Sequence, residues 1–464
     1  MDAIFDIAKI LAGIRYEHIP APAIEMTKKS ILDTLGVTLA GGTIGAGCKE
    51  LVELVKDGGG KQESSILGYG GRVPAWMAAF ANGAMSHALD FDDIDDAAAV
   101  HPGVATVPAG FAIAERVGKV SGKEFLTAIC LGADVLLRLG FAGKKGHGSF
   151  KWLPGQLYGS FSATAVCGKL LQLDENQLVD AFGIALMQVS GSYEPILGTG
   201  SVIRGLWPAF TSKTGVLSAL MAQKGISGSK NSLEGKAALY QSYLGGEYDR
   251  RFLVEDLGKR FLITDSGFKP WPCSGIAKPY IEATIKLIQE NDIQAHDIDE
   301  IVVKVADMAN LLCDPLPERR KPQTPMDAKW SIPFIVAAAA FRGKVTIADF
   351  TPGGIKDADV LRLAQKVRPE FDAQLAPAGR GWTGIPPAVV EIRTTQGKQY
   401  SKRIDVALGY GTNPMTREQH IEKFRDCAAY SAKRLPEADI ERVIQMVERL
   451  EAVEDAGEIV RLLC

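Results

Sequence analysis

A short acidic run flanked by two histidines holds the densest group of chemically active side chains in the sequence. Aspartates occupy five of the seven positions from 90 to 96, and histidines stand at positions 87 and 101. Carboxylates this close repel one another, so the fold must supply cations, hydrogen bonds or shared protons. A histidine beside carboxylates can move protons near neutral pH. The pattern therefore predicts acid/base chemistry with His101 or Asp90 as the proton carrier.

Two other interpretations fit the same residue types. Runs of acidic residues are usually solvated loops. Asp92, Asp93 and Asp96 also have the spacing DDxxD, which in helical isoprenoid synthases holds magnesium and a diphosphate, and magnesium prefers carboxylate oxygens. That interpretation requires a second acidic metal motif on a facing helix, and the sequence shows none.

Three cationic residues stand in surroundings that favour a defined position. Arg204 lies in an otherwise apolar stretch, Lys213 follows on the next expected helix, and Lys269 directly precedes a proline at the expected junction of two domains. Each could have a structural or surface role by itself. Together they predict a polycarboxylate site, because Arg clamps carboxylates bidentately, Lys supplies a mobile charge, and domain junctions are where ligand clefts concentrate.

Other motifs are few. His147 lies in a loop-like Gly-His-Gly context and is a further candidate, whereas His18, His296 and His420 are expected at the surface. The sequence contains no GxSxG, P-loop or HExxH motif, and its glycine-rich segments lack the strand-turn-helix context of a dinucleotide fingerprint. No nucleotide, other cofactor or metal is therefore expected.

The composition is that of an ordinary soluble protein with more than one core. The chain has 464 residues, 46% hydrophobic and 23% charged, and a net charge of -3. Two domains are the default at this length, and the charge favours neither nucleic acid nor membrane as a partner. Seven cysteines without a CxxC pair suit reduced thiols. Because the N-terminus is acidic and no uninterrupted apolar run is long enough to span a membrane, a cytoplasmic protein is expected.

Helical signals fill the first part of the chain. Apolar spacing predicts helices over 25–40 and 49–56, and a helix rich in small residues over 74–89 leads into the acidic run. Ser121 with Glu124 forms a capping box, and Asp174 resembles another helix start. The sequence offers no place for a β-rich core in this region.

The pattern changes near residue 268. Two prolines among residues 270–272 break regular structure, a β-branched strand covers 301–305, and a hairpin is predicted from 389–394 and 399–404. The tail returns to helix. The predicted fold class is mainly α: a helical domain over 1–267, rejoined by 406–464, with an inserted α+β domain over 268–405.

The run from His87 to Asp93, followed by His101 and Pro102, resembles the MmgE/PrpD family, which includes 2-methylcitrate dehydratase, cis-aconitate decarboxylase and iminodisuccinate epimerase. The resemblance extends over nearly the whole chain, with further similar stretches at 26–41, 131–135, 215–220 and 268–273. It implies a helical domain with an inserted α+β lid, a homodimer, and a reaction that needs neither metal nor organic cofactor.

On this resemblance the expected catalytic residues are Asp90, His101 and Lys269. The expected substrate-binding residues are Arg204, Lys213, His147 and Trp152. The implied activity is that of a cofactor-independent lyase or epimerase, similar to 2-methylcitrate dehydratase, which abstracts a proton next to a carboxylate of a small di- or tricarboxylic acid. Leu153 and Trp207 stand where the family often has histidine, which leaves open a member that binds a carboxylate ligand or a protein partner without catalysis.

Overall fold

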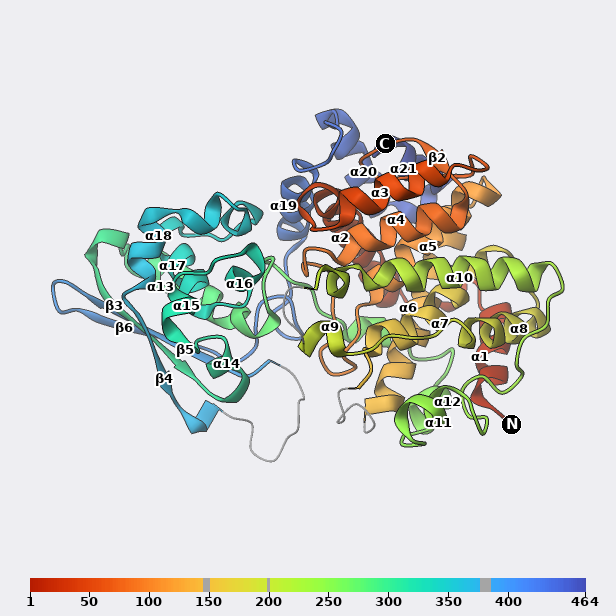
Figure 1. Ribbon diagram of the computed structural model, residues 1–464, viewed down its shortest axis with the longest axis horizontal. Coiled ribbons are helices and arrows are strands. Elements are labelled where there is room, and N and C mark those ends of the chain that lie inside the picture. Colours follow the sequence, from red (N-terminus) through yellow and green to blue (C-terminus); the bar gives the residue numbers. More distant parts are fainter. Residues whose placement is uncertain (145–150, 198–200, 376–384) are drawn as a thin grey trace. The chain divides into compact units, whose positions relative to one another are not determined.

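Two units of different secondary structure make up the chain (Figure 1). The computed structural model describes residues 1–144, 151–197, 201–375 and 385–464. A helical unit is formed by Met1–Ser266 together with His420–Cys464, and an α+β unit by Gly267–Gln419. The predicted fold class, a helical domain with an α+β insert, is confirmed.

The α+β unit continues past the predicted boundary at 405, and hydrogen bonds explain why. The backbone N–H of Leu408 donates to Glu282, and the backbone N–H of Phe268 donates to Gly409. These bonds tie the segment after the last strand to the start of the unit. The chain leaves the unit only at Gln419.

Helices build the first part of the helical unit, and α7 lies among them, with its largest contacts to α10, α6 and α5. The observed helices match the predicted ones closely, and both predicted capping interactions are present, at Ser121 and at Asp174. The helices are α1 (Ala3–Gly13), α2 (Ala21–Ile44), α3 (Cys48–Gly58), α4 (Ala75–His87), α5 (Pro102–Val117), α6 (Gly122–Gly143), α7 (Pro154–Leu170), α8 (Glu175–Leu186), α9 (Glu194–Leu197), α10 (Trp207–Gln223), α11 (Leu239–Leu244) and α12 (Arg251–Val254).

Glycines set the position of α4, the helix that ends at the acidic run. A Cβ at Gly41 of α2 would lie 2.0 Å from the carbonyl oxygen of Met85, and a Cβ at Gly83 would lie 2.5 Å from the carbonyl oxygen of Pro208. Both contacts are possible only without a side chain, so α4 fits closely between α2 and α10. The small-residue pattern therefore fixes where the last residue of α4, His87, lies.

Helix α6 is apolar enough, with a mean hydropathy of 1.8 over its best 18-residue window, to match a membrane span by length and composition. Asp134 and Arg138 interrupt its apolar sequence and form a buried ion pair, 2.6 Å from Oδ2 to Nε. Because 94% of that window is buried inside the unit, α6 is a core helix.

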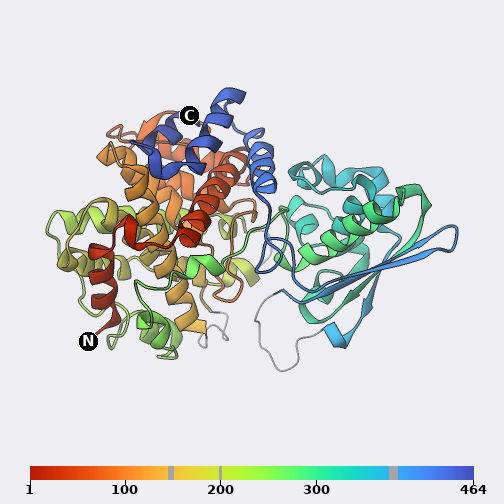
Figure 2. The ribbon, with the colours of Figure 1, turned by 180° about the vertical axis from the view of Figure 1, so that it is seen from behind.

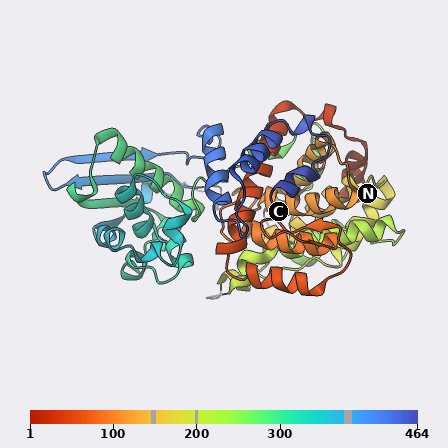
Figure 3. The ribbon, with the colours of Figure 1, turned by 90° about the horizontal axis from the view of Figure 1, so that it is seen from above.

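The C-terminal segment completes the helical unit. Helix α19 (Arg417–Ala428) leads back into it, followed by α20 (Glu437–Glu448) and α21 (Gly457–Leu462). Helix α20 packs against α2, and α21 packs against α5. Figure 3 shows these blue helices beside the red helices from the start of the chain. The unit is thus assembled from segments more than 300 residues apart, since α2 ends at Ile44 and α19 begins at Arg417.

A four-stranded sheet with the order β4-β3-β5-β6 forms the framework of the α+β unit. Strand β3 (Ile298–Val305) pairs parallel with β4 (Val367–Phe371) and antiparallel with β5 (Ala388–Thr394), and β6 (Gln399–Ile404) completes the predicted hairpin. Helices α13 (Lys278–Asn291) and α17 (Ile332–Arg342) pack against it (Figure 2). Shorter helices complete the unit: α14 (Asp307–Leu311), α15 (Leu316–Arg320), α16 (Pro325–Lys329) and α18 (Ala358–Ala364).

Candidate active site

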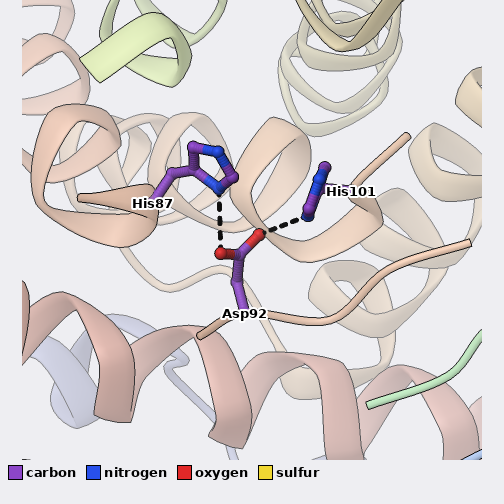
Figure 4. Close-up of side chains that lie close together, drawn as sticks. All are labelled: His87, Asp92 and His101. Atoms are coloured by element: carbon purple, nitrogen blue, oxygen red, sulfur yellow. Dashed lines mark hydrogen bonds and ion pairs between the residues drawn. The ribbon is translucent and has the colours of Figure 1, made fainter. Parts of the chain in front are cut away.

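One buried carboxylate lies between two imidazoles in the helical unit (Figure 4). Asp92 Oδ1 is 2.9 Å from His87 Nδ1, and Asp92 Oδ2 is 2.7 Å from His101 Nδ1. The Asp92 side chain is 0% exposed, whereas the His101 side chain keeps 15% exposure. The rings of the two histidines touch, with centroids 4.7 Å apart. We name these three residues the His-Asp-His cluster.

The hydrogen bonds of the cluster determine which nitrogen of each ring is basic. An ionised carboxylate only accepts hydrogen bonds, so each Nδ1 that faces Asp92 carries the proton. In a neutral imidazole the other nitrogen, Nε2, is then the proton acceptor. A carboxylate that orients an imidazole also stabilises the imidazolium formed when that ring accepts a proton. The arrangement can therefore serve general acid/base chemistry from either histidine.

The electrostatics of the cluster agree with an ionised Asp92. Burial would raise the pKa of Asp92, but the charges and hydrogen bonds of His87 and His101 outweigh it and hold that pKa well below its usual range. Burial lowers the pKa of His87, an effect that Asp92 and, more weakly, Asp90 oppose. His87 is therefore held toward its neutral form.

The turn after α4 brings Asp92 back to the end of that helix. Asp90 has a φ of 53°, in the left-handed region that Asp tolerates better than most residues. Its backbone N–H donates to the carbonyl of His87 at 2.8 Å. The chain thus turns back within three residues of the end of α4. This turn places the carboxylate of Asp92 against the ring of His87.

A closed loop brings the second histidine to the same place. Asp95 and Val100 exchange both backbone hydrogen bonds, at 2.8 and 3.2 Å. His101 is the residue that precedes α5, whose first position is Pro102, a residue well suited to start a helix. The loop therefore delivers His101 next to Asp92 and fixes its backbone.

The interpretation of the acidic run as a solvated loop is wrong for three of its members, since Asp92, Asp93 and Asp95 are only 0%, 1% and 5% exposed. Asp93 accepts the backbone N–H of Gly103 at 2.8 Å and the Ser30 hydroxyl at 2.5 Å. Hydrogen bonds and imidazoles compensate the burial of these carboxylates.

A pocket of about 410 Å³ lies beside the cluster and shares Trp207 with it. The Trp207 ring lies 5.3 Å from that of His87 and 6.2 Å from that of His101, measured between centroids. Other residues of the pocket wall are Trp152, Leu153, Gln156, Ile203, Arg204 and Phe210. Among the described residues that line it, Arg204 is the one cation, so the pocket combines aromatic walls with one guanidinium group.

The remaining predicted site residues lie in different places. Lys213 of α10 is held over two aromatic rings, 5.3 Å from the centroid of Phe80 and 5.8 Å from that of Phe210. Lys269 belongs to the α+β unit, where it is buried. His147 lies outside the described residues. The structure thus brings His101 together with Asp92 and His87, and Arg204 together with Trp152. The roles of all the predicted site residues stay predictions.

Among the described residues, the cluster is also the one group of donor atoms close enough for a metal ion, with all three atoms within 4.8 Å of one another. Each Nδ1, however, faces its own oxygen of Asp92 at hydrogen-bond distance. A zinc ion at about 2.0–2.2 Å from each ligand would have to replace the His87–Asp92 hydrogen bond and the His101–Asp92 contact. The contacts observed here are those of imidazole N–H groups that face acceptor oxygens.

Sequence reasoning missed His87, Asp92 and Trp207 as members of the site. His87 was visible as the histidine at the expected end of a helix, five residues before Asp92. The sequence did not show that Asp92 pairs with the histidines, because any of the five aspartates could have faced them. The left-handed backbone at Asp90 selects Asp92. Trp207 offered no chemical signal by itself.

Comparison with known proteins agrees with this architecture. Residues 5–251 match the MmgE/PrpD N-terminal domain, and residues 271–452 match the MmgE/PrpD C-terminal domain. The cis-aconitate decarboxylases of Mus musculus and Homo sapiens are each 26% identical to the chain, covering 98% of it and 92% and 93% of their own lengths. Cis-aconitate decarboxylase of Aspergillus terreus is 25% identical over 96% of the chain and 93% of its own length. The chain belongs to the MmgE/PrpD family.

Proposed function

We propose that this protein is an enzyme that removes or delivers a proton at a carbon next to a carboxylate of a small di- or tricarboxylic acid. The observation that carries the proposal is Asp92 between two imidazoles, with His101 partly accessible. A proton on such a carbon is weakly acidic, and the negative charge that develops on the carboxylate needs fixed cations. Arg204 in the neighbouring pocket is a suitable group for this charge.

Proton transfer is the step that the reactions known in the family share. Dehydration begins when a base removes the α-proton, and hydroxide then leaves the β-carbon with a proton from an acid. Epimerisation returns the proton to the opposite face. The family and the two histidines support a lyase or epimerase of this kind, with a dehydratase as the first candidate.

Decarboxylation of cis-aconitate is the second candidate, and the relatives named above favour it. Loss of carbon dioxide breaks a carbon–carbon bond and leaves the electron pair on the substrate. A protonated imidazole of the cluster then supplies the proton to that carbon. The cluster would act here as an acid rather than as a base.

A direct test incubates the protein with citrate-like, succinate-like and iminodisuccinate-like acids and with cis-aconitate. Release of carbon dioxide identifies a decarboxylase, an unsaturated product identifies a dehydratase, and inversion without loss of mass identifies an epimerase. If calorimetry detects binding of these acids but no reaction occurs, the protein is a carboxylate-binding member of the family and the proposal fails.

The role of Arg204 is tested by Arg204→Met. Loss of a charge-assisted contact with a carboxylate should raise KM by roughly 10- to 100-fold, and the unfolding temperature should stay close to that of the wild type. Arg251→Met removes an arginine whose side chain is 79% exposed and ion-paired at the surface, and it should leave KM unchanged. An unchanged KM for Arg204→Met would remove Arg204 from the binding site.

A further inference from the structure

A lysine from the returning C-terminal segment lies buried directly behind the acidic run. Lys423 of α19 is 7% exposed, and its ammonium is 2.6 Å from Asp33 Oδ1 of α2. We propose that Lys423 and Asp33 are a positioning pair that holds Asp92 between the two imidazoles. The inference deepens the proposed function and rests on it for its effect on catalysis.

The pair acts first on the residue before Asp92. Lys423 Nζ donates to the backbone carbonyl of Phe91 at 2.6 Å and lies 4.0 Å from the centroid of the Phe91 ring. Both the peptide group and the side chain of Phe91 are thus tied to the same ammonium. The backbone entering Asp92 has little freedom to rotate.

The residue after Asp92 is held from other elements. The Asp93 carboxylate accepts the backbone N–H of Gly103 and the hydroxyl of Ser30, and the Asp93 carbonyl is 2.9 Å from His101 Nδ1. Ser30 belongs to α2, the helix that also carries Asp33. Asp92 is therefore fixed on both sides, by α2 with α19 before it and by α2 with α5 after it.

The buried carboxylates around Asp92 explain why a cation is needed behind the acidic run. Burial raises the pKa of Asp33 to about 6, although Lys423 and the backbone N–H of Asp93 lower it. Burial, together with the charges of Asp33 and Asp92, raises the pKa of Asp93 to about 7. The charge of Asp92 thus acts on both Asp33 and Asp93, and Lys423 is paired with Asp33.

Other titratable groups also face this region. His420 and Cys427 of α19 feel the charge of Lys423, and burial shifts the pKa of both toward their neutral forms. Asp90 and His87 interact on the other side of Asp92. Among these described groups Lys423 acts on Asp33, His420 and Cys427, and Lys29 also acts on His420. Because Lys423 also binds the Phe91 carbonyl, its removal should disturb Asp92 more than a general loss of stability would.

The test compares wild type with the double variant Lys423→Met/Asp33→Asn. Removing both partners leaves no isolated buried charge from this pair, so the double variant should unfold within a few degrees of the wild type, whereas Lys423→Met alone should be strongly destabilised. Lys169→Met is the matched control, because the Lys169 ammonium donates to three backbone carbonyls at the end of α1, away from the acidic run.

The readout is the proton NMR spectrum of imidazole N–H groups bound to carboxylates, which is independent of substrate, together with kcat. Wild type and Lys169→Met should show the downfield signals of His87 and His101. The double variant should lose or broaden them, and its kcat should fall on the order of 10- to 100-fold with little change in KM.

Two results would overturn the proposal: a folded double variant with both downfield signals intact, or one with wild-type kcat. Where the double variant does not fold, Asp33→Asn is examined in the same way, and unchanged signals in that variant overturn the proposal equally. If the signals are lost but the wild type does not react with any acid, the positioning pair stands and the proposed function fails.

Discussion

Asp92 carries one negative charge and contacts two imidazoles. Its charge can therefore not stabilise two imidazolium ions equally well. One carboxylate can stabilise one imidazolium well and a second one less well, so the two rings titrate as a coupled pair. A positive charge on the His101 ring opposes protonation of His87, so the cluster favours one protonated ring at a time. A reaction that needs a base on one side of the substrate and an acid on the other would use this state.

Replacing Asp92 tests the orientation of both rings at once. In Asp92→Asn the amide keeps one acceptor oxygen, and its NH2 group cannot accept from the second imidazole. We expect kcat to fall roughly 100- to 10,000-fold, the usual range for general acid/base catalysis, with the fold retained by circular dichroism. Asp96→Asn, in the same run but less buried, should keep wild-type kcat; equal losses in both variants would contradict a special role for Asp92.

The raised pKa of Asp93 predicts how the variant Asp93→Asn depends on pH. An unfolded Asp loses its proton near pH 3.9, whereas burial raises the folded pKa of Asp93 to about 7. Between these two pH values Asp93 is protonated in the folded chain and ionised in the unfolded chain. The contribution of Asp93 to the free energy of unfolding therefore falls as the pH rises through this range. An asparagine does not titrate.

The difference in unfolding temperature, variant minus wild type, should therefore increase from about pH 5 to about pH 8. Contributions from other groups, such as the lowered pKa of His87, are present in both proteins and largely cancel. A difference that stays constant or decreases over this range would contradict the assignment of Asp93.

At the scale of elements, three helices decide where the cluster lies. Helix α4 ends at His87, α5 begins after His101, and α2 holds the acidic run from behind through Ser30 and Asp33. Helices α2 and α5 approach each other closely at Gly103. A Cβ there would lie 2.1 Å from Thr34 Oγ1 and 3.0 Å from Asp93 Oδ1.

Gly103→Ala should therefore displace the start of α5 and with it His101. We expect a loss of unfolding free energy of about 1–3 kcal/mol, as for other overpacked cores, and a larger fractional loss of kcat than the stability change explains. Gly13→Ala is the matched control, because no atom lies within 4 Å of its Cβ position. If both alanine variants have the same stability and kcat, α2 and α5 are not tightly coupled.

The sequence predicted the local elements well, because their signals are local. The capping residues Ser121 and Asp174, the strand at 301–305 and the hairpin around Gly397 each depend on residues a few positions apart. Strand β4 was missed, since Pro369 and two charged residues dilute its pattern. Helix α6 shows another limit of local signals. Its hydropathy alone does not distinguish a core helix from a membrane span.

The site could be predicted only in part, for a physical reason. His101 and the acidic run were recognisable from residue type, but which aspartate faces the histidines depends on the backbone angle at Asp90. Lys423 lies 332 residues from Phe91, whose carbonyl it binds. A pattern that spans only a few neighbouring residues cannot predict a contact between residues so far apart in the sequence.

For the whole molecule, the insertion of the α+β unit separates the helical unit into two segments that must reassemble. The returning segment supplies Lys423 as well as apolar core residues such as Phe424, Val443 and Ile444. The buried part of the acidic run therefore becomes enclosed only when the first and last segments of the helical unit have folded together. The candidate active site is therefore complete only when the returning segment has placed Lys423 against Asp33 and Phe91.

The claim that the His-Asp-His cluster transfers a proton next to a carboxylate is tested most directly in deuterated water. Wild type and His101→Asn are incubated with the acids named above, and deuterium at the carbon next to the carboxylate is measured by mass spectrometry and NMR. We predict incorporation by the wild type and none above background by His101→Asn, with unfolding temperatures within a few degrees of each other. Incorporation by the variant at the wild-type rate, or none by the wild type with any acid, would contradict the claim.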